Sequence, residues 1–155
     1  MKLSTRSRYA TLALFDIAFH NEGRPTQVRQ IAERQDIPAR FLEQIFQDLK
    51  RADLVDGRRG RNGGYFLKRG PHEISLGDIV RATEGPIEES FCQIEEGGKV
   101  HGACPRNSRC IPAVVWGELS TRIAALYDAY SLQDLVARAE GAGIPRGEPG
   151  YMYFI

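Results

Sequence analysis

The most informative stretch of the sequence for its architecture is TQVRQIAERQDIPARFLEQIFQDLKR, residues 26–51. Its apolar residues recur at three- and four-residue steps, which predicts two short amphipathic helices joined by a tight turn. We expect the first over residues 27–35 with Thr26 as its N-cap, and the second from Pro38 to about Ala52. The two helices form a helix-turn-helix pattern, although helical bundles contain similar pairs. The outward face of the second helix is polar and basic and consists of Arg40, Glu43, Gln44, Gln47 and Arg51.

A loop rich in glycine and arginine follows this helix pair. It spans residues 57–64, GRRGRNGG, between the β-prone runs 54–56 and 65–67, and its Asn62-Gly63 pair is a strong hairpin signal. A helix-turn-helix followed at once by a basic hairpin indicates a winged helix, whereas an ordinary solvated hairpin is the alternative. Arginine suits the narrow, electronegative minor groove of DNA. The loop arginines expected to contact DNA are Arg58, Arg59 and Arg61.

Further helices are predicted on both sides of this unit. Residues 9–21 carry apolar positions at helical spacing, and residues 75–84 begin with a capping box, Ser75 to Asp78. Pro112 opens a long helix that runs to about residue 130 with the apolar stripe Val115, Leu119, Ile123, Leu126 and Tyr130. A last helix, capped by Ser131, runs to about residue 140. We expect the long helix to pack against a second copy, because a symmetric homodimer matches the half-sites of a palindromic operator.

The predicted fold class is mainly α with a small β-hairpin wing: a winged helix-turn-helix followed by a long dimerisation helix. We divide the chain into a DNA-binding domain over residues 1–84 and a cysteine loop over residues 85–111. The dimerisation helix and a short packing helix occupy residues 112–141. The tail, residues 142–155, is rich in glycine and proline and then apolar, and it is expected to dock on the protein or its partner copy.

Charge is distributed unevenly along the 155 residues. Residues 1–72 contain 14 Lys+Arg and 8 Asp+Glu, a net charge of +6, whereas residues 73–155 contain 7 and 12, a net charge of −5. A basic half is expected of a protein that docks on phosphates. The sequence has no apolar run long enough to span a bilayer and no signal-peptide core, so we expect a cytoplasmic protein without membrane contact.

All three cysteines lie in one Gly-rich stretch, FCQIEEGGKVHGACPRNSRC, residues 91–110. Cys92, Cys104 and Cys110 follow the spacing Cys-x11-Cys-x5-Cys, with His101 between the first two. Thiolates are soft ligands for iron, zinc or copper(I), so the cluster indicates a metal site, with three unmetallated thiols as the alternative. Structural zinc sites prefer closely paired cysteines and four firm ligands, which favours an iron–sulfur cluster, either 2Fe–2S or 4Fe–4S.

Three classes of function fit these features to different degrees. A DNA-binding regulator controlled by the cluster accounts for both the arginine-rich wing and the cysteines. An iron–sulfur or thiol redox protein without DNA binding leaves the wing unused, and a winged-helix protein adaptor leaves the cysteines unused. No nucleophile–base pair or paired carboxylates are apparent, so we do not expect an enzyme.

The sequence resembles the winged-helix transcription regulators that include IscR, NsrR and CymR. The resemblance covers residues 1–140 and is carried by MKLSTRSRYATLAL, PARFLEQIFQDLKRADLV, RRGRNGGYFL and the three-cysteine loop. It implies a homodimeric DNA-binding repressor or regulator that senses iron–sulfur status, redox state or nitric oxide. In IscR-like members the positions of Glu43 and Gln44 read base edges, and the position of Arg59 enters the minor groove. This agrees with the pairing of Gln with adenine and of Glu with cytosine.

The cysteine loop departs from the IscR-like pattern. Such loops have two five-residue gaps, whereas the first gap here has eleven residues. The position of the IscR-like histidine ligand is Ala113 here, and the acidic ligand of related nitric oxide sensors corresponds to Arg8. We therefore take His101 as the candidate fourth ligand, because histidine can replace cysteine on a cluster iron. The alternatives are a small molecule, a free iron position, or one of Glu95, Glu96 and Asn107.

Overall fold

The computed structural model describes residues 3–21, 24–88, 93–94, 100–101 and 110–146. Its elements, in chain order, are α1 (Thr5–Asn21), α2 (Val28–Gln35), α3 (Ala39–Arg51), β1 (Val55–Arg58), β2 (Gly64–Leu67), the 3₁₀ helix η1 (Pro71–Glu73), α4 (Leu76–Glu84), β3 (Gln93–Ile94), β4 (Val100–His101), α5 (Ile111–Asp128) and α6 (Leu132–Gly141). This order of elements confirms the predicted fold class, a mainly helical chain with a two-stranded wing.

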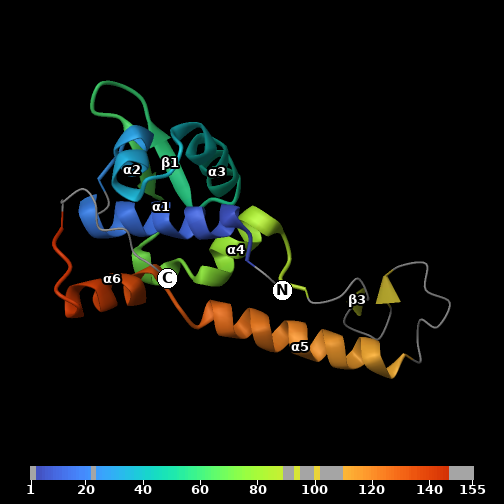
Figure 1. The fold of residues 1–155 in the computed structure, drawn as a ribbon. Coiled ribbons are helices and arrows are strands. Elements are labelled where there is room, and N and C mark those ends of the chain that lie inside the picture. The colour runs from blue at the N-terminus through green and yellow to red at the C-terminus, as the bar shows by residue number, and fades with distance from the viewer. Residues whose placement is uncertain (1–2, 22–23, 89–92, 95–99, 102–109, 147–155) are drawn as a thin grey trace.

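Helix α1 lies at the centre of the molecule (Figure 1). The helices α2 and α3 and the β1–β2 hairpin lie on one side of it, and α4, α5 and α6 lie on the other. Because α1 is covered from two sides, its apolar residues exceed a single stripe. The buried set consists of Ala10, Ala13, Leu14, Phe15, Ile17, Ala18 and Phe19. Three α6 residues belong to the same core, namely Leu132, Val136 and Ala139.

A buried ion pair fastens α1 to α2. Asp16 is fully buried, and its carboxylate accepts hydrogen bonds from Arg34 Nη2 at 2.5 Å and from Arg34 Nε at 2.9 Å. Gln35 Nε2 donates a further bond to Asp16 at 2.9 Å. The hydrogen bond to Asp16 raises the pKa of Arg34 above its usual value, so the guanidinium remains charged. Satisfying the buried carboxylate with several donors offsets the cost of its desolvation.

The start of α2 differs from the prediction. Gln27, not Thr26, occupies the N-cap position, and the helix begins at Val28. Thr26 is buried and instead pairs with Tyr65 of β2 through two backbone hydrogen bonds of 2.8 Å. The prediction was wrong because threonine suits both an N-cap and a β-bridge, and the bridging strand follows far along the chain.

Two other helix boundaries differ from those expected. Helix α1 begins at Thr5 rather than at residue 9, and Pro38 is the N-cap of α3 rather than its first residue. The expected cap Ser75 of α4 is confirmed, since its hydroxyl accepts from the Asp78 backbone at 3.0 Å. The expected cap Ser131 of α6 is likewise confirmed by its bond from Asp134.

Helix α5 extends away from the body of the molecule, with its N-terminal end farthest out (Figure 1). Its C-terminal end is anchored to α4, where Asp128 Oδ1 lies 2.6 Å from Arg81 Nη2 and 3.2 Å from Ser75 Oγ. The backbone of Leu76 also donates to Tyr130 at 2.8 Å. Within the described residues, no helix is long and apolar enough to cross a membrane.

Candidate nucleic-acid interface and cysteine loop

Helix α3 divides into a buried face and an exposed face. Its apolar residues Leu42, Ile45, Phe46 and Leu49 are fully buried, as expected from their spacing. The residues predicted to contact DNA all lie on the exposed face, namely Arg40, Glu43, Gln44, Gln47 and Arg51. No hydrogen bond within the described residues engages the side chains of Arg40, Glu43 or Gln44. These three side chains are therefore available to a ligand.

Asp48 holds α3 in place from its buried side. Its side chain is 7% exposed and forms ion pairs with Arg6 of α1 and with Arg51. Arg51 Nε also donates to the Gln47 carbonyl at 3.4 Å. The guanidinium of Arg51 is thus engaged within α3, although the residue is exposed. This role of Asp48 was not predicted, because a lone acidic residue on a basic helix gives no sequence signal of burial.

The wing places three arginines beside α3. Strands β1 and β2 are antiparallel and pair Val55 with Leu67 through to Arg58 with Gly64, so residues 59–63 form the loop. The hairpin signal at Asn62-Gly63 falls in this loop, but the turn lies one residue earlier than that pair: the Gly63 backbone donates to the Gly60 carbonyl at 2.9 Å, so Arg61 and Asn62 are its central residues. The predicted DNA contacts Arg58, Arg59 and Arg61 are all exposed.

Acidic residues at the base of the hairpin are neutralised locally. Asp56 lies 2.8 Å from Lys50 Nζ, and the hydrogen bond from Lys50 lowers the pKa of Asp56. Asp53 pairs with Lys68, which raises the pKa of that lysine. No ion pair within the described part of the chain involves the wing arginines. Their positive charge therefore faces solvent without compensation, as a phosphate-binding surface requires.

The wing is held against the helix-turn-helix by contacts that the sequence analysis did not identify. The ring of Tyr65 stacks on Phe46 of α3, and Gln47 Nε2 donates to the Tyr65 hydroxyl at 3.3 Å. Gln27 Nε2 donates to the Arg61 carbonyl at 3.1 Å. These contacts join the tip and the base of the wing to α2 and α3. Tyr65 was predicted only as a strand residue, since no local pattern indicates a partner in α3.

Part of the predicted metal site can be described. Cys110 is half-buried at the N-cap position of α5. His101 lies in β4 opposite Gln93, the residue after Cys92, and β3 lies against α5. Cys92 and Cys104, as well as the alternative ligands Glu95, Glu96 and Asn107, fall outside the described residues. Among the residues that are described, no group of three potential metal ligands lies together.

The donor set of this loop suits an iron–sulfur cluster. Cysteine thiolates are the usual ligands of such clusters, and an imidazole can replace a thiolate on one iron. The described backbone brings His101 across from the residue next to Cys92, and Cys110 terminates the loop at α5. Ala113, at the position of the IscR-like histidine, is buried and has no ligating atom.

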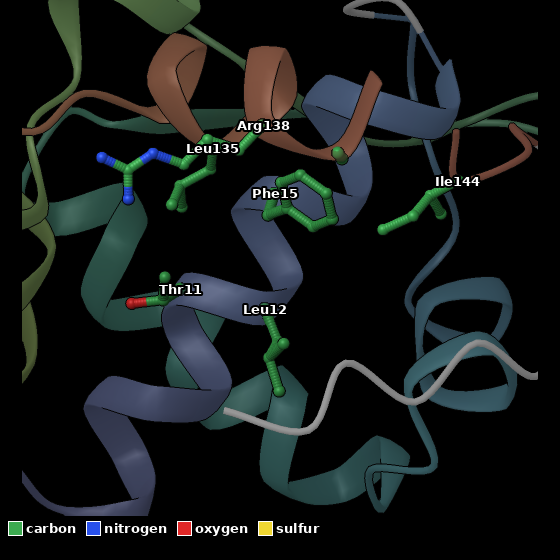
Figure 2. A pocket seen from close by; sticks show the side chains of 7 residues that line it. Thr11, Leu12, Phe15, Leu135, Arg138 and Ile144 are labelled. Atoms are coloured by element: carbon green, nitrogen blue, oxygen red, sulfur yellow. The ribbon is translucent and has the colours of Figure 1, made fainter. Parts of the chain in front are cut away.

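An apolar groove lies between α1 and α6 (Figure 2). Its volume is about 220 Å³, and it is lined by Leu12, Phe15, Leu135 and Ile144. Its polar groups are the guanidinium of Arg138 and the hydroxyl of Thr11, which donates to the Ser7 carbonyl at 3.0 Å. Among the described residues that line this groove there is no acid–base pair.

The helix-turn-helix, the wing beside it and the protruding helix define the class of the protein, a winged-helix transcription regulator. The sequence model of the family described as "Rrf2: Iron-dependent Transcriptional regulator" matches residues 3–138, and the chain belongs to this family. Its similarity to transcription regulators confirms the expectation that it is no enzyme.

Individual relatives agree with this assignment. The chain is 36% identical over 140 residues to "HTH-type transcriptional regulator IscR" of Aliivibrio salmonicida, covering 90% of this chain and 80% of that protein. The solved structure of T. potens IscR is 33% identical, with a TM-score of 0.70, and covers 99% of this chain and 97% of that one. The global cysteine regulator CymR of B. subtilis is 31% identical, with a TM-score of 0.69, covering 89% of this chain and 98% of that one.

Proposed function

We propose that the chain is a cytoplasmic, homodimeric transcription regulator that binds a palindromic operator in double-stranded DNA. The observation that carries this proposal is the exposed polar face of α3 together with the wing, which is joined to α3 by the contacts of Tyr65 with Phe46 and Gln47. Arg40, Arg58, Arg59 and Arg61 are exposed on these two elements, and none of them forms an ion pair with another described residue. Lysine and arginine contacts to phosphate supply most of the affinity of such proteins, while side chains in the major groove supply specificity.

Individual roles follow from the positions of these residues. Glu43 and Gln44, near the first turns of α3, are proposed to read base edges in the major groove. Gln47 and Arg51 lie farther along the same exposed face and are proposed to contribute to DNA binding from there. Arg59 is proposed to enter the minor groove from the wing loop. Arg40, Arg58 and Arg61 are proposed to contact DNA from the same surface.

A binding assay at several salt concentrations tests this proposal. Wild-type protein is expected to shift a duplex that it has selected from a random-sequence pool, with an affinity that falls steeply as salt rises. Arg59→Ala is expected to weaken binding by about 10-fold, in line with the loss of 1–3 kcal/mol for a groove contact. The matched control is Arg29→Ala, an exposed α2 arginine that pairs with Glu33. Equal affinity of Arg59→Ala and wild type would refute the assignment of the wing.

We further propose that Cys92, Cys104, Cys110 and His101 hold an iron–sulfur cluster, either 2Fe–2S or 4Fe–4S. When bound, the cluster would supply a redox- and nitric oxide-sensitive centre. The position of Cys110 supports a route to the DNA-binding unit, because this residue caps the N-terminus of α5. The other end of α5 is fastened to α4 through Asp128 and Arg81, and α4 packs against α1 and α3. A change in the cysteine loop that moves α5 would thus be transmitted through α4 to α3, the helix proposed to read DNA.

Anaerobic purification tests the cluster and its ligands. The protein is expected to be coloured and to contain iron and sulfide, whereas Cys110→Ala is expected to lose both. His101→Ala is expected to shift the visible absorption or to make the cluster more labile; His72→Ala, an exposed histidine on η1, is the control. An unchanged spectrum of His101→Ala would exclude its role as the fourth ligand. Equal operator binding by cluster-loaded and cluster-free protein would exclude the sensing role.

A further inference from the structure

The side chain of Tyr65 joins the wing to α3. Its ring stacks on that of Phe46, with centroids 4.3 Å apart and an angle of 9° between the planes. Phe46 is fully buried, so the Tyr65 ring rests on a fixed part of the core. On the solvent side, the Tyr65 hydroxyl accepts a hydrogen bond from Gln47 Nε2 at 3.3 Å. The aromatic contact and the hydrogen bond together fix the distance of the Tyr65 ring from α3 and its orientation.

The backbone around Tyr65 is fixed independently of its side chain. Two backbone hydrogen bonds of 2.8 Å join Tyr65 to Thr26, and β2 also pairs with β1. The loop of residues 59–63 extends beyond the last strand pair, Arg58 with Gly64. The hairpin itself forms without the Tyr65 side chain. The orientation of its loop relative to α3, however, depends on side-chain contacts such as those of Tyr65 with Phe46 and Gln47.

Gln47 differs from its neighbour Gln44 on the exposed face of α3. The amide of Gln47 is directed toward Tyr65, whereas no hydrogen bond engages the Gln44 amide within the described residues. A bidentate contact with adenine requires that the amide oxygen and nitrogen are both presented to the base. Gln44 meets this requirement, while the orientation of Gln47 is set by the wing.

We infer that Tyr65 is a positioning residue that sets the angle between the wing and α3, and that Gln47 acts through it instead of reading a base. The inference rests on the proposed DNA-binding function and refines it. A fixed angle allows α3 and Arg59 to occupy neighbouring grooves at the same time. The Tyr65 side chain contributes to DNA affinity without needing to touch DNA.

The first test combines substitutions at Tyr65 and Arg59. Tyr65→Phe keeps the stacked ring and removes only the hydroxyl, so it is expected to fold normally and to weaken binding to the selected duplex by about 3-fold, the effect of one partly exposed hydrogen bond. In this background, Arg59→Ala is expected to weaken binding by a smaller factor than it does in wild type. If the two losses simply multiply, Tyr65 does not act through the wing and the inference is wrong.

The second test separates positioning from base reading. Gln47→Ala is expected to weaken binding as much as Tyr65→Phe does and to add nothing in the Tyr65→Phe background. Gln44→Ala is the matched control and is expected to cost the same factor in both backgrounds. A full additional loss for Gln47→Ala, together with a changed preference at one base pair, would show that Gln47 reads a base.

A measurement without DNA distinguishes failure of the inference from failure of the proposed function. Amide hydrogen exchange of residues 58–63 is expected to be faster in Tyr65→Phe than in wild type, with an unchanged unfolding midpoint. If the wild-type protein binds no DNA, the proposed function is refuted, but faster exchange in Tyr65→Phe would still support the positioning role of Tyr65. Unchanged exchange in the wing would refute the positioning role whether or not DNA binds.

Discussion

At the scale of single residues, Gly64 shows how closely the wing approaches the helix-turn-helix. Its φ is +154°, and a Cβ at this position would lie 2.3 Å from the carbonyl carbon and oxygen of Thr26. These are backbone atoms held in the bridge between Thr26 and Tyr65, so they have no freedom to move aside. The residue at position 64 must adopt a positive φ and must lack a Cβ, and only glycine does both.

Gly64→Ala is therefore expected to lower the free energy of unfolding by about 2–3 kcal/mol, through backbone strain and steric conflict. Urea denaturation followed by circular dichroism measures the change. Gly141→Ala is the matched control, because a Cβ there meets no atom within 4 Å, and its effect is expected to stay within about 0.5 kcal/mol. If Gly64→Ala unfolds at the wild-type midpoint, the close approach of the wing to Thr26 is wrong.

At the scale of elements, the N-terminus of α1 is capped by its own Ser4, whose hydroxyl accepts from the Ser7 backbone at 3.3 Å, and by a carboxylate of another helix. The first turn of α1 contains no acidic residue. Glu84, the last residue of α4, accepts hydrogen bonds from the Ser4 backbone at 3.0 Å and from the Ser4 hydroxyl at 2.9 Å, and it also pairs with Ser7. The carboxylate supplies the acceptor and the negative charge that a helix N-terminus favours. Glu84 directly precedes the segment that leads to the cysteines, so its hydrogen bonds also fix the position where that segment begins.

The Glu84 cap predicts a pH dependence. Burial raises the pKa of Glu84, but the hydrogen bonds from Ser7 and Ser4 outweigh it and lower the pKa below its ordinary value of 4.5. Because the pKa of Glu84 is lower in the folded state, protons bind the unfolded state more readily. The contribution of Glu84 to the free energy of unfolding is therefore present above pH 4.5 and is lost as the pH falls through the folded-state pKa. Glu84→Gln is expected to be less stable than wild type at neutral pH, with a difference that shrinks in acid.

Thermal unfolding between pH 3 and pH 7 measures this difference, a range chosen to span about one unit or more on either side of an ordinary glutamate pKa. Glu33→Gln serves as the control, because its exposed pair with Arg29 contributes only about 0.2–0.5 kcal/mol. A constant gap between Glu84→Gln and wild type over the whole range would contradict the capping role.

Elements defined by local chemistry were predictable from the sequence. The caps Ser75 and Ser131, and the helices that they begin, depend on residues three positions apart. The bridge of Thr26, the cap from Glu84 and the stack on Phe46 depend on partners distant in the chain, and the sequence contains no sign of them. The exposed polar face of α3 lies between these cases, because periodicity places its residues outward while the wing contact orients Gln47.

At the scale of the whole molecule, several large apolar side chains of α5 are exposed in the part of the chain that the structure describes. Ile111 and Leu126, near opposite ends of the helix, are 71% and 65% exposed. Other large apolar side chains exposed along α5 and just beyond it are Val114, Val115, Trp116, Leu119 and Tyr130. Exposed apolar patches of this kind mark interaction sites, and a symmetric dimer would cover both copies of the patch. The anchoring of α5 to α4 would then set the separation of the two α3 helices.

Leu126→Glu tests whether this surface joins two copies. A buried charge in an apolar interface is costly, so the variant is expected to sediment as a monomer at concentrations where wild type is a dimer. The helix-turn-helix core does not include Leu126, so its unfolding should remain cooperative. Operator affinity is expected to fall by about 100-fold, because each half-site is then bound independently. Thr121→Glu places the same charge at an exposed polar position of α5 and is expected to stay dimeric. A dimeric Leu126→Glu protein with wild-type operator affinity would show that α5 does not hold the two copies together.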